Sequence, residues 1–346
     1  METRGYAVLE ANAPLVPFTF ARRDLRPTDI AFDIKYAGIC HSDIHQAREE
    51  WGSAIFPMVP GHEIVGVVTA VGSEVTKHAI GDRVGVGVFI DSCRTCDNCL
   101  AGQQQYCEKG MTGTYNGYER DGTTVAMGGY SNKFVIDQDY ALKIPSTLDL
   151  SGVAPLLCAG ITLYSPLRHW KAGPGQKVGV IGLGGLGHMG VKFAAAMGAE
   201  VTVFSHSAGK EEDAKRMGAK HFVVTKDPEV FAAHAESFDL ILNTVSAELD
   251  VNQYLGLLKI NGTLVVIGLP GKPYEVTAFN LLRLRRSLAG SMIGGLPEIQ
   301  EMLNFCAEKN IVSDVEVIKA DYINEAYDRT VKSDVKYRFV IDADSF

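Results

Sequence analysis

A glycine-rich turn between an apolar run and a helical stretch is the feature that most constrains this fold. The apolar run is Lys177–Ile181, the turn reads Gly182-Leu183-Gly184-Gly185-Leu186-Gly187, and the helical stretch is His188–Met197. A Gly-x-Gly-x-x-Gly pattern alone is a weak signal, but between a strand and a helix it indicates a dinucleotide-binding turn. The helix N-terminus then offers free N–H groups to a pyrophosphate. We therefore expect a dinucleotide cofactor to contact Gly182, Gly184, Gly185, Leu186 and Gly187.

Short apolar runs and helical stretches continue to alternate after this turn. The expected strands are Glu200–Phe204, His221–Val224, Asp239–Asn243 and Thr263–Ile267. Helices are expected at Lys210–Met217 and Leu249–Leu258. This alternation predicts an α/β domain built on a doubly wound parallel sheet, the Rossmann arrangement.

The chain before Pro145 has a different pattern, rich in valine, glycine and short alternating runs, which predicts a β-rich domain. Its expected strands include Ala31–Tyr36, Ile64–Val71, Arg83–Val88 and Ser131–Ile136. Near the C-terminus, helical stretches at Glu298–Glu308 and Tyr322–Lys332 precede an apolar strand at Lys336–Ile341. We expect this last strand to return to the first domain.

Length and charge narrow the possible classes of protein. A chain of 346 residues suggests two domains. A net charge of −8 without a long block of lysine and arginine argues against nucleic acid or an anionic membrane as a partner. The N-terminus, Met1–Tyr6, lacks the apolar region of a signal peptide, and no apolar run approaches a membrane span. The expected location is the cytoplasm.

Four of the seven cysteines lie close together in the spacing C-x2-C-x2-C-x7-C. They are Cys93, Cys96, Cys99 and Cys107. Four thiolates can enclose one tetrahedral zinc ion with every position filled, which predicts a structural site. Two disulfides are the alternative in an oxidising compartment, and similar spacings also hold iron–sulfur clusters.

A second set of metal-binding residue types is spread along the chain. Cys40 lies in Gly38–Asp43, His62 follows Pro60-Gly61, and Cys158 follows two leucines. Each residue taken alone reads as an ordinary buried side chain, and nothing in the spacing joins them. Two cysteines and one histidine would leave a fourth position on zinc open for water or substrate.

The end of the strand after the glycine-rich turn indicates which dinucleotide binds. NAD-binding domains place a carboxylate there to hold the ribose hydroxyls. Here the strand ends in Ser205-His206-Ser207, and Lys210 follows. Two hydroxyls and a cation suit a 2′-phosphate, so we expect NADP(H) rather than NAD(H). The alternative for Ser205 and Ser207 is a plain turn at the strand end.

With these motifs in place, the chain resembles the zinc-containing medium-chain alcohol dehydrogenases over essentially its whole length. It is most similar to the cinnamyl alcohol dehydrogenase-like branch, which includes bacterial NADP-dependent aldehyde reductases. The motifs that carry the resemblance are GICHSDIH, PGHEIVGVV, the four-cysteine segment, the Cys158 segment and GLGGLGHMGVKFAAAMGA. It implies a GroES-like catalytic domain, residues 1–150 and 295–346, with an NADP-binding Rossmann domain inserted at 151–294.

The resemblance also assigns roles to single residues. It implies that Cys40, His62 and Cys158 hold a catalytic zinc, which makes two zinc ions per chain. Glu63 matches a glutamate that can approach this metal, and Asp43 a carboxylate that orients the zinc-bound histidine. Ser42 and His45 match a proton relay. Further cofactor contacts are implied for His41, Thr162, Thr244 and Arg338, and substrate-pocket positions for Trp51, Thr112, Met292 and Ile293.

The expected function is hydride transfer between NADPH and aromatic or medium-chain primary aldehydes, or the reverse with alcohols. Thr112 stands where plant cinnamyl alcohol dehydrogenases carry a bulky aromatic side chain, which argues against strict cinnamyl specificity. The apolar segment Leu281–Met292 matches a strand that pairs across a homodimer. Alternatives are an NAD-dependent zinc polyol, threonine or formaldehyde dehydrogenase, a zinc-free quinone or enoyl reductase, and a non-catalytic nucleotide-binding relative.

Overall fold

The computed structural model describes all of residues 1–346, and the chain divides into two compact units. Unit 1 comprises Met1–Ile161 and Gly294–Phe346, and unit 2 comprises Thr162–Ile293. No single helix is long and apolar enough to cross a membrane; one bent pair, Leu150–Leu157 with Ala159–His169, passes that test only when taken together.

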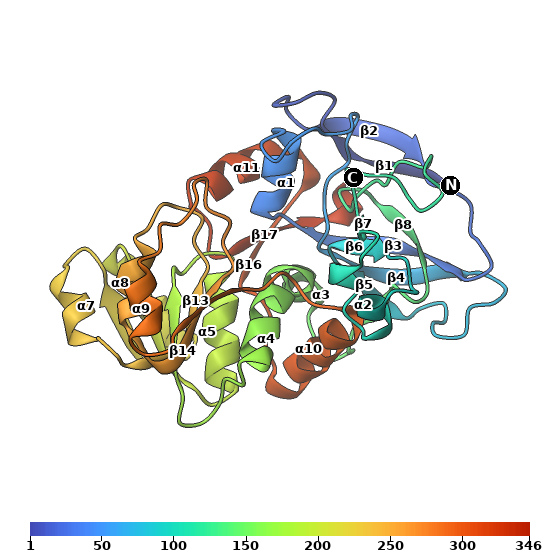
Figure 1. Cartoon of the computed structure of the whole chain (residues 1–346). Coiled ribbons are helices and arrows are strands. Elements are labelled where there is room, and N and C mark those ends of the chain that lie inside the picture. The colour runs from blue at the N-terminus through green and yellow to red at the C-terminus, as the bar shows by residue number, and fades with distance from the viewer. The chain divides into compact units, whose positions relative to one another are not determined.

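Unit 1 is built around a seven-stranded sheet whose main path runs β16-β17-β3-β4-β5-β9, with β8 also paired to β3. The bounds are β3 Asp29–Gly38, β4 Ile64–Val71, β5 Arg83–Val86, β8 Lys133–Asp137, β9 Leu142–Lys143, β16 Val315–Ile318 and β17 Arg338–Asp342. The final strand β17 pairs antiparallel with β3, with Val340 opposite Gly38, so the C-terminal segment completes the first sheet (Figure 1).

Two small ribbons and several short helices complete unit 1. The ribbons are β1 Glu2–Ala7 with β2 Val16–Ala21, and β6 Phe89–Asp91 with β7 Thr112–Gly113. The helices are α1 His41–Ala47, α2 Asp97–Leu100, η1 Gln104–Tyr106, α3 Leu150–Val153, η2 Ala154–Leu157, α10 Leu296–Lys309, η4 Ala320–Tyr322, α11 Ile323–Val331 and η5 Ala343–Ser345. The helix α4, Ala159–His169, begins in unit 1 and continues into unit 2.

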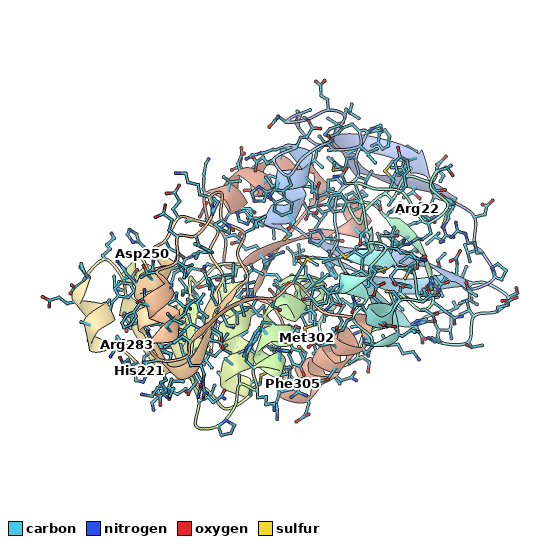
Figure 2. All side chains as sticks on the ribbon, viewed as in Figure 1. Arg22, His221, Asp250, Arg283, Met302 and Phe305 are labelled. Carbon is cyan, nitrogen blue, oxygen red and sulfur yellow. The ribbon has the colours of Figure 1, made fainter.

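The structure extends the first unit past the predicted boundary at residue 150. The segments α3 and η2 contact strands β3 and β4 of the unit 1 sheet. Met302 of α10, labelled in Figure 2, is fully buried, and its sulfur would lie 3.1 Å from a Cβ placed on Gly160. Apolar packing therefore keeps residues 151–161, including Cys158, with the β-rich unit.

Unit 2 is a six-stranded parallel sheet in the order β12-β11-β10-β13-β14-β15. Its strands are β10 Lys177–Ile181, β11 Glu200–Ser205, β12 His221–Val224, β13 Phe238–Asn243, β14 Leu258–Val266 and β15 Ser287–Gly290. Its helices are α5 Gly187–Ala196, η3 Ala208–Lys210, α6 Glu211–Arg216, α7 Glu229–Ala233, α8 Val251–Gly256 and α9 Ala278–Leu282. This strand order is that of a dinucleotide-binding doubly wound sheet, so the predicted fold class is confirmed.

Candidate active site and metal centres

Three distant chain segments of unit 1 bring four metal-binding side chains together. Cys40 follows β3, His62 and Glu63 precede β4, and Cys158 follows η2. Their candidate ligand atoms all lie within 4.8 Å of one another, and all four residues are buried. We call these four residues the open cluster.

The sulfur and nitrogen spacings of the open cluster match a tetrahedral zinc site. Cys40 Sγ lies 4.0 Å from Cys158 Sγ, and His62 Nε2 lies 3.3 Å from Cys158 Sγ. On a tetrahedral zinc, with Zn–S near 2.3 Å and Zn–N near 2.0 Å, two sulfurs stand about 3.8 Å apart and a sulfur and a nitrogen about 3.5 Å apart, so both spacings lie within a few tenths of an ångström of this geometry. The two thiols and the imidazole therefore fit one zinc ion, which the spacing of the sequence could not establish.

The Asp43 carboxylate orients the open cluster through hydrogen bonds to the segments that carry Cys40 and His62. The Asp43 side chain is fully buried and accepts hydrogen bonds from the backbone N–H groups of Cys40 at 2.9 Å and Gly61 at 3.1 Å. The same carboxylate lies 2.9 Å from His62 Nδ1. A proton on Nδ1 leaves Nε2 free to face the cysteine sulfurs, which is the tautomer that a metal requires.

Glu63 forms a buried ion pair with Arg338 of β17 at the edge of the open cluster. Burial raises the pKa of the Glu63 carboxyl to about 7, while Arg338 opposes that rise. Glu63 Oε2 and Arg338 Nε have no hydrogen-bond partner in the structure. Glu63 is thus placed to reach a metal ion, whereas the assignment of Arg338 to the cofactor stays a prediction.

The two thiols of the open cluster shift each other's pKa in opposite directions. The hydrogen bond with Cys158 is the largest cause that lowers the pKa of Cys40 well below its usual range, against the effect of burial. The same interaction, together with burial, raises the pKa of Cys158. A bound divalent cation stabilises both sulfurs as thiolates.

The residues of the predicted proton relay lie on α1. Ser42 Oγ is 3.6 Å from Cys40 Sγ, next to the open cluster. His45 stands one turn further along α1, its Nδ1 contacts the Glu50 carboxylate, and its ring stacks on Trp51 at 4.8 Å between centroids. Glu50 carried no sequence signal that distinguished it from other surface acids. Trp51 is 46% exposed, and its place in a substrate pocket stays a prediction.

Two tyrosines that the sequence analysis missed also approach the open cluster. Tyr115 lies with its ring stacked on His62 at 5.9 Å between centroids. Tyr130 is fully buried and donates a hydrogen bond of 3.0 Å to Asp43 Oδ2. Burial and the charge of Asp43 raise the pKa of the Tyr130 phenol well above its usual range, so the hydroxyl keeps its proton. No local pattern in the sequence could have indicated these contacts.

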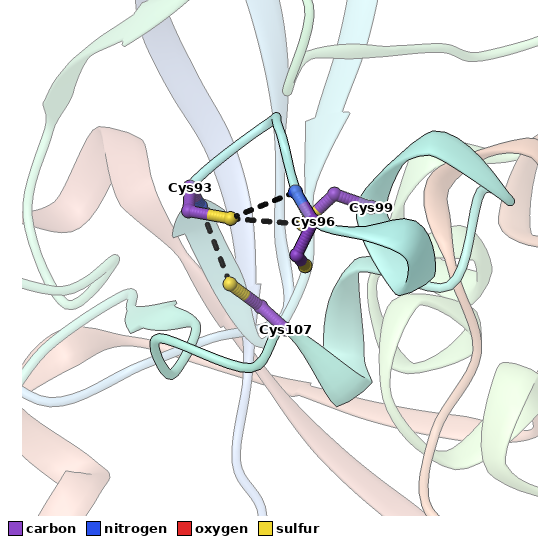
Figure 3. Close-up of side chains that lie close together, drawn as sticks. All are labelled: Cys93, Cys96, Cys99 and Cys107. Carbon is purple, nitrogen blue, oxygen red and sulfur yellow. Dashed lines mark hydrogen bonds between the residues drawn. The ribbon is translucent and has the colours of Figure 1, made fainter.

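The four-cysteine lobe forms a second cluster (Figure 3). The sulfurs of Cys93, Cys96, Cys99 and Cys107 lie within 4.8 Å of one another, and none forms a disulfide. Cys93 Sγ is 3.9 Å from Cys99 Sγ and accepts a hydrogen bond from the Cys96 backbone N–H at 3.3 Å. Hydrogen bonds from the backbone of Thr95 and Cys96 lower the pKa of Cys93 to about 5, which favours the thiolate. Four sulfurs fill a tetrahedral zinc completely.

A hydroxyl pair supports this lobe from inside unit 1. The Cys99 thiol donates to Ser92 Oγ at 3.1 Å, and Ser92 shares a hydrogen bond of 2.6 Å with the Tyr140 hydroxyl. The Arg94 guanidinium lies 4.9 Å above the Tyr140 ring. These contacts connect the lobe to the turn between β8 and β9.

In unit 2, the glycine-rich turn joins β10 to α5 as predicted. Gly182 has a φ of +88°, which favours glycine, and its N–H donates to Phe204 O at 2.8 Å. A Cβ on Gly187 would lie 2.0 Å from Gly182 O, whereas a Cβ on Gly184 would meet nothing within 4 Å. Thr244 Oγ1 donates to Ile181 O at 2.7 Å, so the structure places Thr244 beside the turn.

The predicted 2′-phosphate residues follow β11. Ser205 ends the strand, and its Oγ donates to Ser207 O at 3.0 Å. Lys210 Nζ donates to Leu183 O at 2.9 Å, so this cation lies over the glycine-rich turn. The structure thus gathers Ser205, Ser207, Lys210 and Thr244 at one end of the parallel sheet.

The remaining predicted site residues are placed but not joined to a ligand. His41 begins α1 and is exposed, and Thr162 is buried in α4. Thr112 is buried in β7, opposite Asp91 of β6. Met292 and Ile293 end unit 2. Their cofactor and substrate contacts stay predictions.

Comparison with known proteins gives the family. Residues 26–146 match the alcohol dehydrogenase GroES-like domain, and residues 185–308 match the zinc-binding dehydrogenase domain. The chain is 62% identical to NADP-dependent alcohol dehydrogenase C 1 of Mycolicibacterium smegmatis over 342 residues, 99% of this chain and 98% of that protein. It is 52% identical to aldehyde reductase YahK of Escherichia coli, covering 99% of this chain and 98% of that protein.

A solved structure agrees with this match. The cinnamyl alcohol dehydrogenase of Sorghum bicolor superposes with a TM-score of 0.95 at 44% identity, covering 99% of this chain and 98% of that one. The predicted resemblance is thereby confirmed. The chain belongs to the zinc-containing medium-chain alcohol dehydrogenases, in their cinnamyl alcohol dehydrogenase-like branch.

Proposed function

We propose that this protein is a zinc- and NADP-dependent alcohol dehydrogenase that works as an aldehyde reductase. The observation that carries the proposal is the open cluster, in which Cys40, His62 and Cys158 present two sulfurs and one nitrogen at tetrahedral spacing. The names of the Mycolicibacterium and Escherichia relatives support the same reaction. A non-catalytic nucleotide-binding relative would have no use for such a cluster.

Two zinc ions per chain fit the two cysteine-containing clusters. The four-cysteine lobe offers four sulfurs, so its zinc would have no open position and would serve the fold. The open cluster offers three ligands and a nearby carboxylate, so its zinc would keep a position for substrate. Six of the seven cysteines are used in this way, which fits a reducing compartment such as the cytoplasm.

The chemistry at the open cluster follows from its donor set. Zinc held there supplies a Lewis acid that polarises the carbonyl oxygen, and NADPH supplies the hydride. Ser42, beside Cys40 at the start of α1, is placed to give its hydroxyl proton to the oxygen of the product. His45 and the Glu50 carboxylate then offer a path for replacing that proton from solvent, because both side chains are partly exposed.

The proposed preference for NADP(H) rests on the end of β11. Ser205, Ser207 and Lys210 lie there, with no carboxylate between them. A cation and two hydroxyls attract a 2′-phosphate, while a carboxylate at this position would repel it. The same observation argues against an NAD-dependent polyol, threonine or formaldehyde dehydrogenase activity for this chain.

Aromatic and medium-chain primary aldehydes are the proposed substrates. The family resemblance assigns the apolar side chains of Trp51, Met292 and Ile293 and the small side chain of Thr112 to the substrate site, and an apolar lining would favour such aldehydes. Broad acceptance of aldehydes would follow, without strict selection of cinnamyl compounds.

A homodimer is the proposed assembly. Strand β15, Ser287–Gly290, ends the parallel sheet, so its outer edge has no strand partner within the chain. Phe279 and Leu282 of the neighbouring helix α9 are 66% and 75% exposed. An open edge beside exposed apolar side chains favours pairing with a second copy. Sedimentation would test this, because a monomer would sediment near 37.5 kDa.

The direct test of the proposed activity joins a metal measurement to an enzyme assay. We expect about two zinc ions per purified chain, and oxidation of NADPH but much slower oxidation of NADH with benzaldehyde, cinnamaldehyde, medium-chain aldehydes and formaldehyde. Absence of aldehyde-dependent NADPH oxidation with a fully zinc-loaded protein would exclude the proposal. Faster turnover with NADH would instead favour an NAD-dependent dehydrogenase.

A further inference from the structure

The carboxylate behind the open cluster is also hydrogen-bonded by side chains from distant parts of the chain, among them Tyr130. Three donors to Asp43 are the metal ligands and their neighbour, namely the backbone N–H groups of Cys40 and Gly61 and the His62 ring. A further donor is the Tyr130 hydroxyl, 3.0 Å from Oδ2 and 87 residues away in the sequence. Tyr130 therefore donates to the same oxygen, Oδ2, as the Cys40 N–H.

The backbone of residues 128–130 holds the Tyr130 ring against the loop that carries His62. Tyr130 N donates to Pro60 O at 2.9 Å, and Gly129 N donates to Gly61 O at 2.9 Å. Gly61 has a φ of +104°, and a Cβ there would lie 2.6 Å from Tyr130 Cδ1. The ring thus packs directly on Gly61, the residue before His62. The backbone hydrogen bonds and this ring contact together fix the position of the Tyr130 hydroxyl.

A second buried tyrosine lies behind the Tyr130 hydroxyl. Tyr327 of α11 donates from its hydroxyl to the Tyr130 hydroxyl at 3.5 Å, and the two rings meet edge to face at 6.4 Å. A hydroxyl that accepts from Tyr327 keeps its own hydrogen for Asp43. The chain Tyr327–Tyr130–Asp43–His62 is buried throughout.

We propose that Tyr130 is a positioning residue of the open cluster, which acts through Asp43 to hold His62 in the geometry that binds the metal. The proposal rests on zinc occupying that cluster, as in the proposed function. Asp43 must keep one oxygen aligned with His62 Nδ1, and a hydroxyl fixed on its other oxygen prevents the carboxylate from rotating away. Such partners of a metal ligand commonly set metal affinity as much as the ligands do.

Tyr130→Phe tests the proposal, because it removes the hydroxyl and keeps the ring on Gly61. Removing an outer partner of a metal ligand typically weakens metal binding about 10- to 100-fold. Tyr130 contacts Asp43 rather than a metal ligand itself, so we expect an effect at the lower end of this range. Zinc should leave the open cluster about 10-fold faster when a chelator is added and the released zinc is followed with an indicator dye. Cysteine alkylation followed by mass spectrometry identifies the site, because Cys40 and Cys158 become reactive while Cys93–Cys107 stay protected.

Tyr140→Phe is the matched control, because Tyr140 is also buried but bonds to Ser92 beside the four-cysteine lobe. We expect it to leave zinc loss from the open cluster unchanged. The absorption spectrum of cobalt-substituted protein adds a second readout, in which only Tyr130→Phe shifts the bands of the open cluster. In an Asp43→Asn background, Tyr130→Phe should add no further effect.

Three results would overturn the proposal. One is zinc loss from the open cluster of Tyr130→Phe within twofold of the wild-type rate. Another is equal acceleration at both clusters with a lower melting temperature, which would show only a packing role. If Tyr130→Phe fails to fold, Tyr327→Phe carries the test, and an unchanged rate there overturns the proposal. A wild-type protein that holds two zinc ions keeps the proposed function standing in each case, whereas one without metal at the open cluster ends both.

Discussion

The third glycine of the dinucleotide turn gives a perturbation whose size follows from the structure. In Gly187→Ala, the new methyl group would lie 2.0 Å from Gly182 O and 2.9 Å from the carbon of the same carbonyl. Gly182 cannot retreat, because its own N–H is bonded to Phe204 and its other face lies against Val245. The turn and the start of α5 must therefore separate to admit one methyl group.

The energetic cost follows from what obstructs the methyl group. Overpacking a tight site costs about 1–3 kcal/mol, and an obstructing backbone carbonyl cannot turn aside as a side chain would, so we expect about 3 kcal/mol. At about 3 °C for each kcal/mol, a domain of this size would lose roughly 9 °C in melting temperature. Circular dichroism or scanning calorimetry of the protein without cofactor measures this change.

Gly184→Ala is the matched control in the same turn. A methyl group there meets nothing within 4 Å, so we expect the melting temperature to stay within about 1 °C of wild type. Because the space at this glycine is where a pyrophosphate would approach the backbone, we expect the NADPH dissociation constant to rise about 10-fold or more. Fluorescence titration measures it. A Gly187→Ala protein as stable as wild type, or a Gly184→Ala protein that binds NADPH normally, would refute this division of roles.

Four further substitutions test the sites, and one labelling experiment tests a buried thiol outside them. Cys40→Ser and His62→Ala should each lower aldehyde turnover below detection and remove one zinc ion per chain in elemental analysis; near-normal activity in either would contradict the open cluster. Cys99→Ser should destabilise the fold by several kcal/mol in urea unfolding, because structural zinc contributes to folding; a stable, fully active variant would exclude a structural metal. Lys210→Ala should raise KM for NADPH about 10-fold through loss of the charged contact to the 2′-phosphate, with little change for NADH; equal changes for both cofactors would contradict a phosphate contact. Burial raises the pKa of Cys306 to about 12, so its thiol should resist iodoacetamide at pH 8 until the protein unfolds, as mass spectrometry of labelled peptides would show.

Sequence reasoning was most accurate where one local rule determined the structure. Lys177–Ile181 was predicted as a strand and forms β10 with the same bounds. A short apolar run before a glycine-rich turn forms few structures other than a buried strand. His221–Val224 and Ile64–Val71 also match β12 and β4. Strands of two or three residues were missed, such as β7 at Thr112–Gly113, because they exist only through their pairing with a distant strand.

Sequence motifs predicted the metal-binding residues of the active site but not the contacts around them. Residue types and family resemblance gave Cys40, His62 and Cys158, and the structure brings them together. The contacts of Glu50 and Tyr130 depend on how α1 ends and how residues 128–130 pack on the His62 loop. Such contacts have no period and no local pattern, so only the folded structure reveals them.

The two metal clusters differ in what holds them together, and this difference explains their surroundings. Cys93 and Cys107 are 14 residues apart, whereas Cys40 and Cys158 are 118 residues apart. Because loop-closure entropy grows with the logarithm of loop length, closing the longer loop costs about 2 kcal/mol more. A zinc ion can therefore assemble the lobe from a nearly unstructured segment, but the open cluster must be assembled by the sheet and then aligned. Asp43 provides this alignment, because its single carboxylate is hydrogen-bonded to Cys40, Gly61 and His62. Removal of both zinc ions should consequently loosen the lobe and lower the stability of unit 1, while unit 1 stays folded around an empty open cluster.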